Sequence, residues 1–393
     1  MARSLPPRTR NPFEFGRELA PDELVDRDTE LAAITRAVAN RGKLFFIGPR
    51  RYGKTSILNA VEHRLAARGT VVLRYDAEAF ESLTLLAQAL LTGAARKLTG
   101  PVAKAGGVIA RLFSRLKPEV NYDLAAHRLT VRIAAGPGGK GSELPVLTEV
   151  LDGIERLAAG SKKPVVVILD EFQQVVREGG EAAERQIRAA IQRHRHVSYV
   201  FAGSKTRLLA DLTSDPGRAF WKLGERLFLQ AVPREDFRPF LARGFRTAGF
   251  KTTSEGIERI LDAAEDVPYN VQRLASACWE RLRVGEDRVL TAAAVDQALR
   301  AVVLSENPAY TQIWTNLTRA QKTALKAVIE EGGRELLGRA VLQRHDLAAS
   351  TMQRALQALD TMGIVREDES GGAIRFRLED PFFPAWLAVA QEH

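Results

Sequence analysis

Sulfur-containing residues are scarce in this chain. Its 393 residues include three methionines and a single cysteine, Cys278. One cysteine cannot form an intramolecular disulfide or supply a cysteine-rich metal site. Disulfide-stabilised and cysteine-ligated metal folds are therefore excluded, and Cys278 is expected to be a small buried residue in a reducing compartment.

Long apolar runs are also missing. No run of 18 apolar residues occurs, and the first residues, MARSLPPRTRNPF, are basic without an apolar signal core. We therefore expect a cytoplasmic protein with no membrane partner. A hydrophobic content of 45% and a charged content of 27% are ordinary for a globular protein. The length is too great for one hydrophobic core and favours two or three domains.

One stretch, LFFIGPRRYGKTSIL at residues 44–58, is far more informative than the composition. Four of its residues fit the phosphate-binding pattern G-x-x-x-x-G-K-[ST], namely Gly48, Gly53, Lys54 and Thr55. Glycines let the backbone curl so that successive N–H groups point at phosphate oxygens. The residues before this loop are typical of a buried strand and those after it of an amphipathic helix, which is the context that a P-loop requires.

The P-loop pattern assigns roles to its residues. We expect nine consecutive residues to bind the nucleotide: Gly48, Pro49, Arg50, Arg51, Tyr52, Gly53, Lys54, Thr55 and Ser56. Lys54 would reach the β- and γ-phosphates, and Thr55 would place its hydroxyl on Mg²⁺. The helix that starts near Gly53 adds the positive end of its dipole. The predicted ligands are ATP and Mg²⁺.

A second stretch, KKPVVVILDEFQQ, ends an apolar run in two acids. Residues 165–169 are continuously apolar, as expected for a parallel strand buried on both faces. Asp170 and Glu171 follow, at the carboxyl edge where ligands bind in open α/β sheets. Asp170 can hold Mg²⁺ through its waters, and Glu171 can polarise an attacking water. A solvated acidic turn is the alternative, but the P-loop upstream favours the metal and catalytic roles.

The rest of the N-terminal half extends this pattern. Further strands are predicted at residues 70–77, in HVSYVFAGSK and in GERLFLQ. Residues 119–133 alternate apolar and polar side chains and run into a glycine-rich stretch, which predicts a β-hairpin that projects from the core. His194 and His196 lie at the end of a predicted helix, where they are expected to complement its dipole rather than bind a metal.

Together these segments resemble the AAA+ and STAND-like P-loop ATPases, in the additional-strand class that includes origin-recognition proteins. The nearest group is the prokaryotic or archaeal-type ATPases with a C-terminal winged helix. VDRDTEL at residues 25–31 is similar to the box that borders the adenine site, and FAGSK occupies the sensor-1 position. EDVPYNVQRLASACWERL resembles the lid, and STMQRALQALDTMGIVRED resembles the winged helix.

The resemblance implies further site residues. Val25 would border the adenine, and Arg273 would be the sensor-2 arginine. Ser204 would take the sensor-1 position, although the family usually has Asn or Thr there. Arg218, chosen over Arg226, would be the arginine finger that acts in trans. The implied catalytic set is Glu171, Lys54, Ser204 and Arg218.

The expected fold class is α/β, with a five-stranded parallel P-loop sheet in the order 5-1-4-3-2 and helices on both faces. The P-loop ATPase core would span residues 1–232, with the inserted hairpin at about 117–141. A helical lid would follow at residues 233–315 and a winged-helix domain at residues 316–393.

The formal net charge of +9 is unevenly distributed. Residues 1–140 hold 23 Lys/Arg and 13 Asp/Glu, residues 141–315 hold 24 of each, and residues 316–393 hold 10 and 11. Part of the N-terminal excess is expected to face nucleotide phosphates. A solvated basic surface explains the remainder as well as a nucleic-acid stripe does.

The presumed recognition helix of the winged helix, STMQRALQALDTMG, also has few cations. Five residues at helical spacing should face the core: Met352, Ala355, Leu356, Leu359 and Met362. Four should face outward: Gln353, Arg354, Gln357 and Thr361. One outward arginine is a poor basis for phosphate contacts. Arg375 and Arg377 in the wing could add contacts, but acids in the same hairpin offset them.

Three functions remain open. The preferred one is an ATP-driven switch, a Mg²⁺-dependent and slow ATPase that relays its nucleotide state through the lid and winged helix to a protein partner. The alternative is a DNA-acting ATPase of the initiator or transposition-helper kind, which would bind DNA, the less favoured partner, through the winged helix and the basic N-terminal third. A kinase is the least favoured, because no acceptor site is evident. A nucleotide-dependent homo-oligomer is compatible with each of them.

Overall fold

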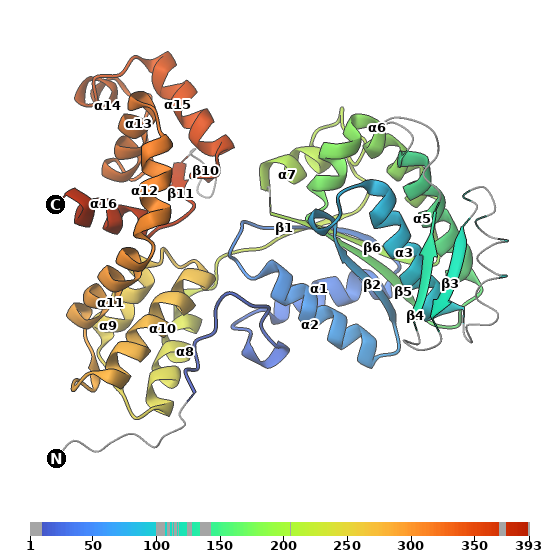
Figure 1. The fold of residues 1–393 in the computed structure, drawn as a ribbon, viewed down its shortest axis with the longest axis horizontal. Helices are drawn as coiled ribbons and strands as arrows, with labels where there is room; N and C mark the ends of the chain where they lie inside the picture. The colour runs from blue at the N-terminus through green and yellow to red at the C-terminus, as the bar shows by residue number, and fades with distance from the viewer. Residues whose placement is uncertain are drawn as a thin grey trace. The chain divides into compact units, whose positions relative to one another are not determined.

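The computed structural model describes residues 10–99, 107, 111, 113, 116, 118–123, 128–133, 143–204, 206–368 and 375–391. The chain forms two compact units (Figure 1). One spans Arg17–Ala231, and the other combines Met1–Gly16 with Val232–His393. Among the described residues, no helix has both the length and the apolar character needed to cross a membrane.

The first unit is built on a five-stranded parallel sheet. Its strands are β1 (Lys43–Ile47), β2 (Val71–Asp76), β5 (Val165–Asp170), β6 (Val197–Gly203) and β7 (Glu225–Phe228). Their order across the sheet is β2-β5-β6-β1-β7, and neighbouring strands pair in parallel. With the strands numbered along the chain and the hairpin left out, this is the predicted order 5-1-4-3-2, which is confirmed.

Helices cover both faces of this sheet (Figure 1). On one face lie α1 (Asp28–Ala39) and α2 (Lys54–Ala67); on the other lie α3 (Leu83–Leu98), α5 (Glu143–Ala159), α6 (Gln173–Ile191) and α7 (Thr206–Ser214). Short 3-10 turns at Pro21–Glu23 and Ala77–Ala79 complete the regular structure of this unit. Strand side chains alternate between the two cores: Leu44 and Phe46 face α1 and α2, and Phe45 and Ile47 face the opposite side. Both faces are buried, so the strands need continuous apolar runs.

The predicted hairpin forms, but the prediction that it projects from the core is wrong. Strands β3 (Glu119–Asp123) and β4 (Arg128–Arg132) pair antiparallel. Val131 and Ile133 are buried in the same core as α3 and α5. The backbone N–H of Val131 donates to Thr92 Oγ1 at 3.2 Å, and Gln88 Nε2 donates to the Ile133 carbonyl at 3.2 Å. The apolar side of β4 therefore covers α3. The glycine-rich stretch that follows, residues 134–142, lies outside the described residues.

The second unit begins with a helical lid. It contains α8 (Arg234–Thr247), α9 (Ser254–Ala263), α10 (Pro268–Val284) and α11 (Ala292–Ser305), with β8 (Lys251–Thr252) pairing β9 (Val289–Leu290). The N-terminal segment packs into this lid, since Phe13 is 3% exposed and its ring centroid lies 4.8 Å from that of Phe245. Cys278 is buried in α10, as expected.

A winged-helix arrangement follows in the same unit. Its elements are α12 (Asn307–Asn316), α13 (Arg319–Glu330), α14 (Arg339–Arg344), α15 (Ala349–Thr361), β10 (Val365–Asp368), β11 (Arg375–Leu378) and α16 (Phe383–Gln391). Strands β10 and β11 pair as the antiparallel wing. An aromatic cluster of Tyr310, Trp314, Phe383 and Trp386 joins α12 to α16.

The faces of the presumed recognition helix, α15, are mostly as predicted. Met352, Ala355, Leu356 and Leu359 are buried. Gln353, Arg354, Gln357 and Thr361 are exposed. The prediction for Met362 is wrong, because this residue is 54% exposed. Met362 is the C-cap residue of the helix and lies beyond its last helical residue, Thr361.

His194 has a different role from the one predicted. Its side chain is buried and joins two elements: Nδ1 lies 2.7 Å from the hydroxyl of Tyr199, and Nε2 lies 2.8 Å from Asp152 Oδ1. Burial lowers the pKa of His194 despite the nearby carboxylates. His194 is therefore part of the packing between α5, α6 and β6, rather than a surface group at a helix end.

This lowered pKa predicts a pH dependence of stability. Because the unfolded chain binds the His194 proton more readily than the folded one, stability falls as the pH decreases below about 6.5, the ordinary histidine pKa. The His194→Gln variant should lose part of this slope, measured as the free energy of unfolding in urea at several pH values. His196→Gln is the matched control. An unchanged slope in His194→Gln would contradict the assignment.

Candidate functional site

The P-loop joins β1 to α2 and has the backbone that its sequence requires. Gly53 is the N-cap residue of α2 with φ of 86°, in the left-handed region that favours glycine. A Cβ on Gly48 would lie 2.6 Å from Leu229 Cβ, so this position has no room for a side chain. Gly53 is thus needed for the turn and Gly48 for the close packing against Leu229, independently of any ligand.

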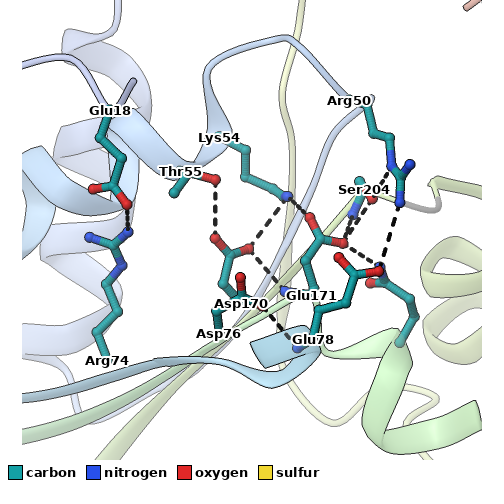
Figure 2. Close-up of polar contacts among 11 residues, drawn as sticks. Glu18, Arg50, Lys54, Thr55, Arg74, Asp76, Glu78, Asp170, Glu171 and Ser204 are labelled. Carbon is teal, nitrogen blue, oxygen red and sulfur yellow. Dashed lines mark hydrogen bonds and ion pairs between the residues drawn. The ribbon is translucent and has the colours of Figure 1, made fainter. Parts of the chain in front are cut away.

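Lys54 is the first residue of α2 and lies against both predicted acids (Figure 2). Its Nζ is 2.6 Å from Glu171 Oε1 and 3.4 Å from Asp170 Oδ1, and the residue is only 5% exposed. Thr55 donates to Asp170 Oδ2 at 3.3 Å. The structure therefore brings the predicted P-loop residues Lys54 and Thr55 together with the two acids that follow β5, about 115 residues later in the chain.

The carboxylate of Glu171 is held on both oxygens. Oε2 accepts hydrogen bonds from Ser204 Oγ at 2.8 Å, from the Ser204 backbone N–H at 3.3 Å and from Gln173 Nε2. Burial would raise the pKa of Glu171, but Lys54 and these hydrogen bonds outweigh it and lower the pKa. Glu171 is thus an ionised carboxylate that can accept a proton.

The backbone at Glu171 is unusual for a residue with a side chain. Its φ is 48°, in the left-handed region. Hydrogen bonds on both sides hold this conformation: Phe172 N–H donates to the Ala202 carbonyl at 2.8 Å, and Gln174 N–H donates to the Glu171 carbonyl at 2.9 Å. Such conformations cost of order 1–3 kcal/mol and are concentrated at functional sites.

Sequence reasoning missed Gln173, which supports Glu171. Gln173 begins α6 and is 3% exposed. Its Nε2 donates to Glu171, whereas its buried Oε1 has no hydrogen-bond partner among the described residues. That oxygen lies against Gly203, where any Cβ would overlap it. The only signal in the sequence is that Gln173 lies two residues after Glu171, and this spacing does not indicate a role unless the position of Gly203 on β6 is known.

Arg27 was also missed, and it holds the N-terminal box. Its guanidinium pairs with Glu30 at 3.0 Å and donates to the carbonyls of Gln230 at 3.0 Å and Tyr52 at 3.4 Å. Burial lowers its pKa, partly offset by Glu30. Arg27 therefore ties the box to the P-loop and to the end of β7. Val25, predicted to border the adenine, lies half-buried two residues before it.

The remaining P-loop residues differ in exposure. Arg50 and Arg51 are exposed, whereas Ser56 is buried and its Oγ accepts from the Leu19 N–H at 3.0 Å. Arg50 reaches across the site, with Nε 3.4 Å from Ser204 Oγ and a guanidinium nitrogen 3.9 Å from Glu78 (Figure 2). Pro49 and Tyr52 are half-buried.

The two arginines implied by the resemblance both have acidic partners. Arg218 pairs with both oxygens of Glu184, which is 2% exposed. Arg273 lies 2.6 Å from Glu306 and stacks over the ring of Phe382 in the second unit. Arg226, the alternative to Arg218, is exposed and donates to Ser214 Oγ. Their roles toward a nucleotide stay predictions.

The donor set around Lys54 fits Mg²⁺. A threonine hydroxyl and an aspartate carboxylate are hard oxygen donors, and Mg²⁺ is usually held by one or two such groups together with waters and substrate phosphates. Thr55 and Asp170 would hold it here. No group of three or more His, Cys, Asp or Glu residues that could hold a metal occurs within the described part of the chain, so a cage made of protein ligands alone is not formed there.

Comparison with known proteins agrees with this geometry. Residues 38–210 match the model of the AAA domain, and residues 308–389 match that of a probable winged helix domain. Residues 38–210 therefore correspond to an AAA domain of the P-loop ATPase type, which implies nucleotide binding, and the winged helix follows this domain in sequence. Among curated proteins, none matches the chain.

Two solved structures share the fold over nearly the whole chain. The Walker-type ATPase PABY2304 of Pyrococcus abyssi has 17% identity and a TM-score of 0.61, covering 96% of this chain and 99% of that one. The Aeropyrum pernix ORC2 protein, in ADPNP–ADP complexes, has 18% identity and a TM-score of 0.56, covering 98% and 97%. At these identities the likeness establishes the fold and no more.

The contact between Gly203 and Gln173 predicts a destabilising substitution. Gly203→Ala should cost about 1–3 kcal/mol of unfolding free energy, because the new Cβ would overlap Gln173 and Leu209. Gly160→Ala, with only the Leu157 carbonyl at 3.7 Å, is the control. Urea denaturation should also show a smaller cost of Gly203→Ala in a Gln173→Ala background. Equal costs in the two backgrounds would mean that Gln173 is not the obstacle.

Proposed function

We propose that this protein is a Mg²⁺-dependent ATPase that acts as a nucleotide-driven switch. The observation that carries the proposal is the cluster of Lys54, Thr55, Asp170 and Glu171 at the carboxyl edge of the sheet. A buried lysine held between two carboxylates is a cation placed where triphosphate oxygens bind in P-loop proteins.

Each residue then has one task. Lys54 leaves its carboxylate partners to bind the β- and γ-phosphates, and Thr55 and Asp170 hold Mg²⁺. The ion, when bound, neutralises the charge that develops on the phosphates. Glu171 accepts the proton of the attacking water, while Ser204 and Gln173 keep its carboxylate in place. The products are ADP and phosphate. The same proposal includes three further residues: Val25 borders the adenine, Arg218 is the arginine finger that acts in trans, and Arg273 is the sensor-2 arginine.

The second unit supports the proposed relay to a partner. Arg377 of the wing lies 3.2 Å from Glu265 of the lid and 2.6 Å from Asp368 of its own hairpin. Arg273 of the lid pairs with Glu306 at the start of α12. The Arg377–Glu265 contact joins the lid, at about residues 233–315, to the winged helix from about residue 316, and the Arg273–Glu306 contact joins α10 to the start of α12. A displacement of the lid would therefore carry the winged helix with it.

The wing itself favours a protein partner over DNA. Arg377 is engaged by two carboxylates, and Arg375 donates to the Gly332 carbonyl at 2.8 Å. Neither arginine is free for a phosphate without giving up a contact. We therefore propose that this protein is cytoplasmic and that its winged helix binds a protein partner. Nucleotide-dependent formation of homo-oligomers would be a further element of the switch.

Removal of the P-loop cation tests nucleotide binding. Lys54→Ala should abolish ATP binding measured by calorimetry, because Lys54 is the cation directed at the β- and γ-phosphates. Arg68→Ala removes an exposed cation at the other end of α2 and should change the affinity by less than about twofold. Circular dichroism would establish that both variants are folded. Undiminished ATP affinity in Lys54→Ala would sink the P-loop assignment.

Removal of the base separates binding from hydrolysis. Glu171→Gln should bind Mg·ATP with nearly unchanged affinity but hydrolyse it about 10²-fold or more slowly, because an amide cannot accept the water proton. Glu78→Gln, an exposed acid near the same edge, should keep the rate. Asp170→Asn should instead raise the Mg²⁺ concentration needed for half-maximal rate. An unchanged rate in Glu171→Gln would place the base elsewhere.

A further inference from the structure

The loops at the amino ends of four of the five strands are basic, whereas the loop before β7, residues 215–224, also contains Asp215. The four basic loops comprise residues 40–42 before β1, 68–70 before β2, 160–164 before β5 and 192–196 before β6. Together these amino-edge loops contain six Lys or Arg residues and no Asp or Glu: Arg41, Arg68, Lys162, Lys163, Arg193 and Arg195. The opposite edge of the same sheet holds the acids Asp76, Asp170 and Glu171.

The amino-edge loops are neighbours in space. They precede adjacent strands in the order β2-β5-β6-β1. Direct hydrogen bonds connect them: Val71 N–H donates to the Pro164 carbonyl at 2.8 Å, and the Arg41 guanidinium donates to the Arg195 carbonyl at 3.4 Å. At about 4.8 Å between strands, the four loops span roughly 15 Å. The cations therefore form one row.

Most of this charge is uncompensated. Asp152 and Glu155 of α5 lie nearby, but Asp152 is engaged by His194 and Arg193, and Glu155 accepts from backbone N–H groups of the 192–196 loop. The other five cations are exposed, and within the described part of the chain none of them pairs with a carboxylate: Arg41, Arg68, Lys162, Lys163 and Arg195.

Helix dipoles do not account for the row. A cation near a helix C-terminus complements the dipole, and the helices before these four strands all end at this edge. Each already has an arginine in its last turn: Arg36 in α1, Arg64 in α2, Arg156 in α5 and Arg188 in α6. The loop cations come in addition to these four.

From this arrangement we propose that the amino-edge loops bind the phosphate backbone of duplex DNA without regard to sequence. A row of exposed cations is what such binding requires, since it depends mainly on Lys/Arg–phosphate contacts. A protein partner is less well matched, because protein interfaces have an apolar or aromatic core and these loops contain no aliphatic or aromatic side chain apart from prolines and histidines. The surface lies at the strand ends away from Lys54, so DNA and nucleotide can be bound together.

The experiment uses the full chain and a short fluorescent duplex of arbitrary sequence. Fluorescence anisotropy at several salt concentrations gives the affinity and its salt dependence. The triple variant Lys162→Glu/Lys163→Glu/Arg195→Glu should bind at least about tenfold more weakly, and the slope of log K against log salt should flatten by about two to three, at about 0.9 per lost phosphate contact. Calorimetric ATP affinity should be unchanged, which establishes that the variant is folded.

The matched control reverses three exposed cations of the winged helix instead. Arg319→Glu/Arg339→Glu/Arg354→Glu alters α13, α14 and α15 and should leave DNA affinity within about twofold. Three results would overturn the proposal: no salt-dependent binding by the unaltered chain, an unchanged affinity in the amino-edge variant, or a loss confined to the winged-helix variant. Binding of an acidic protein without DNA binding would count against it as well. The outcome is independent of whether the protein hydrolyses ATP.

Discussion

The ion cluster of Lys54 with Asp170 and Glu171 is the interaction on which the site depends. Two adjacent carboxylates with so little solvent would repel each other strongly without a cation between them, and breaking a buried pair typically costs 3–5 kcal/mol. The cluster also holds the P-loop in position against the end of β5, because Lys54 contacts two consecutive residues there, Asp170 and Glu171. A ligand that takes Lys54 must compensate these acids, which Mg²⁺ can do.

Strand order explains which other residues reach this cluster. Between β5 and β1 lies β6, so the residue that follows β6, Ser204, stands between the acids and the P-loop. It contacts Glu171 on one side and Arg50 on the other. A hydroxyl suits this place because it can donate to the carboxylate and accept from the guanidinium at once. Ser204, which stands where the AAA+ family usually has Asn or Thr, can therefore make both of these contacts.

What the sequence could predict follows from the range of the interactions. The strands follow from apolar runs and their order from the resemblance to P-loop ATPases, and both are confirmed. Short patterns marked the P-loop and the acids after β5, which the structure brings together, while their roles stay predictions. Gln173 and Arg27 were missed because their partners lie 30 and about 200 residues away, at Gly203 and Gln230. Met362 was misassigned because helical spacing predicts which face a residue occupies but not how much of that face is covered at the helix end. The hairpin was misjudged because alternation predicts a strand but not the surface it covers.

The N-terminal segment places a limit on how this protein can be recombined. Phe13 fills space against Gly244 and Phe245 inside the lid, and Asn11 donates to Ser276 Oγ at 2.9 Å. The chain leaves that unit after Gly16 and returns to it at Val232. The lid is therefore not a contiguous cassette: an excised segment starting at residue 232 would lack an aromatic side chain of its own core. Exchange of the AAA domain between related proteins would have to include an N-terminal segment whose residues, such as Asn11 and Phe13, match the recipient's lid.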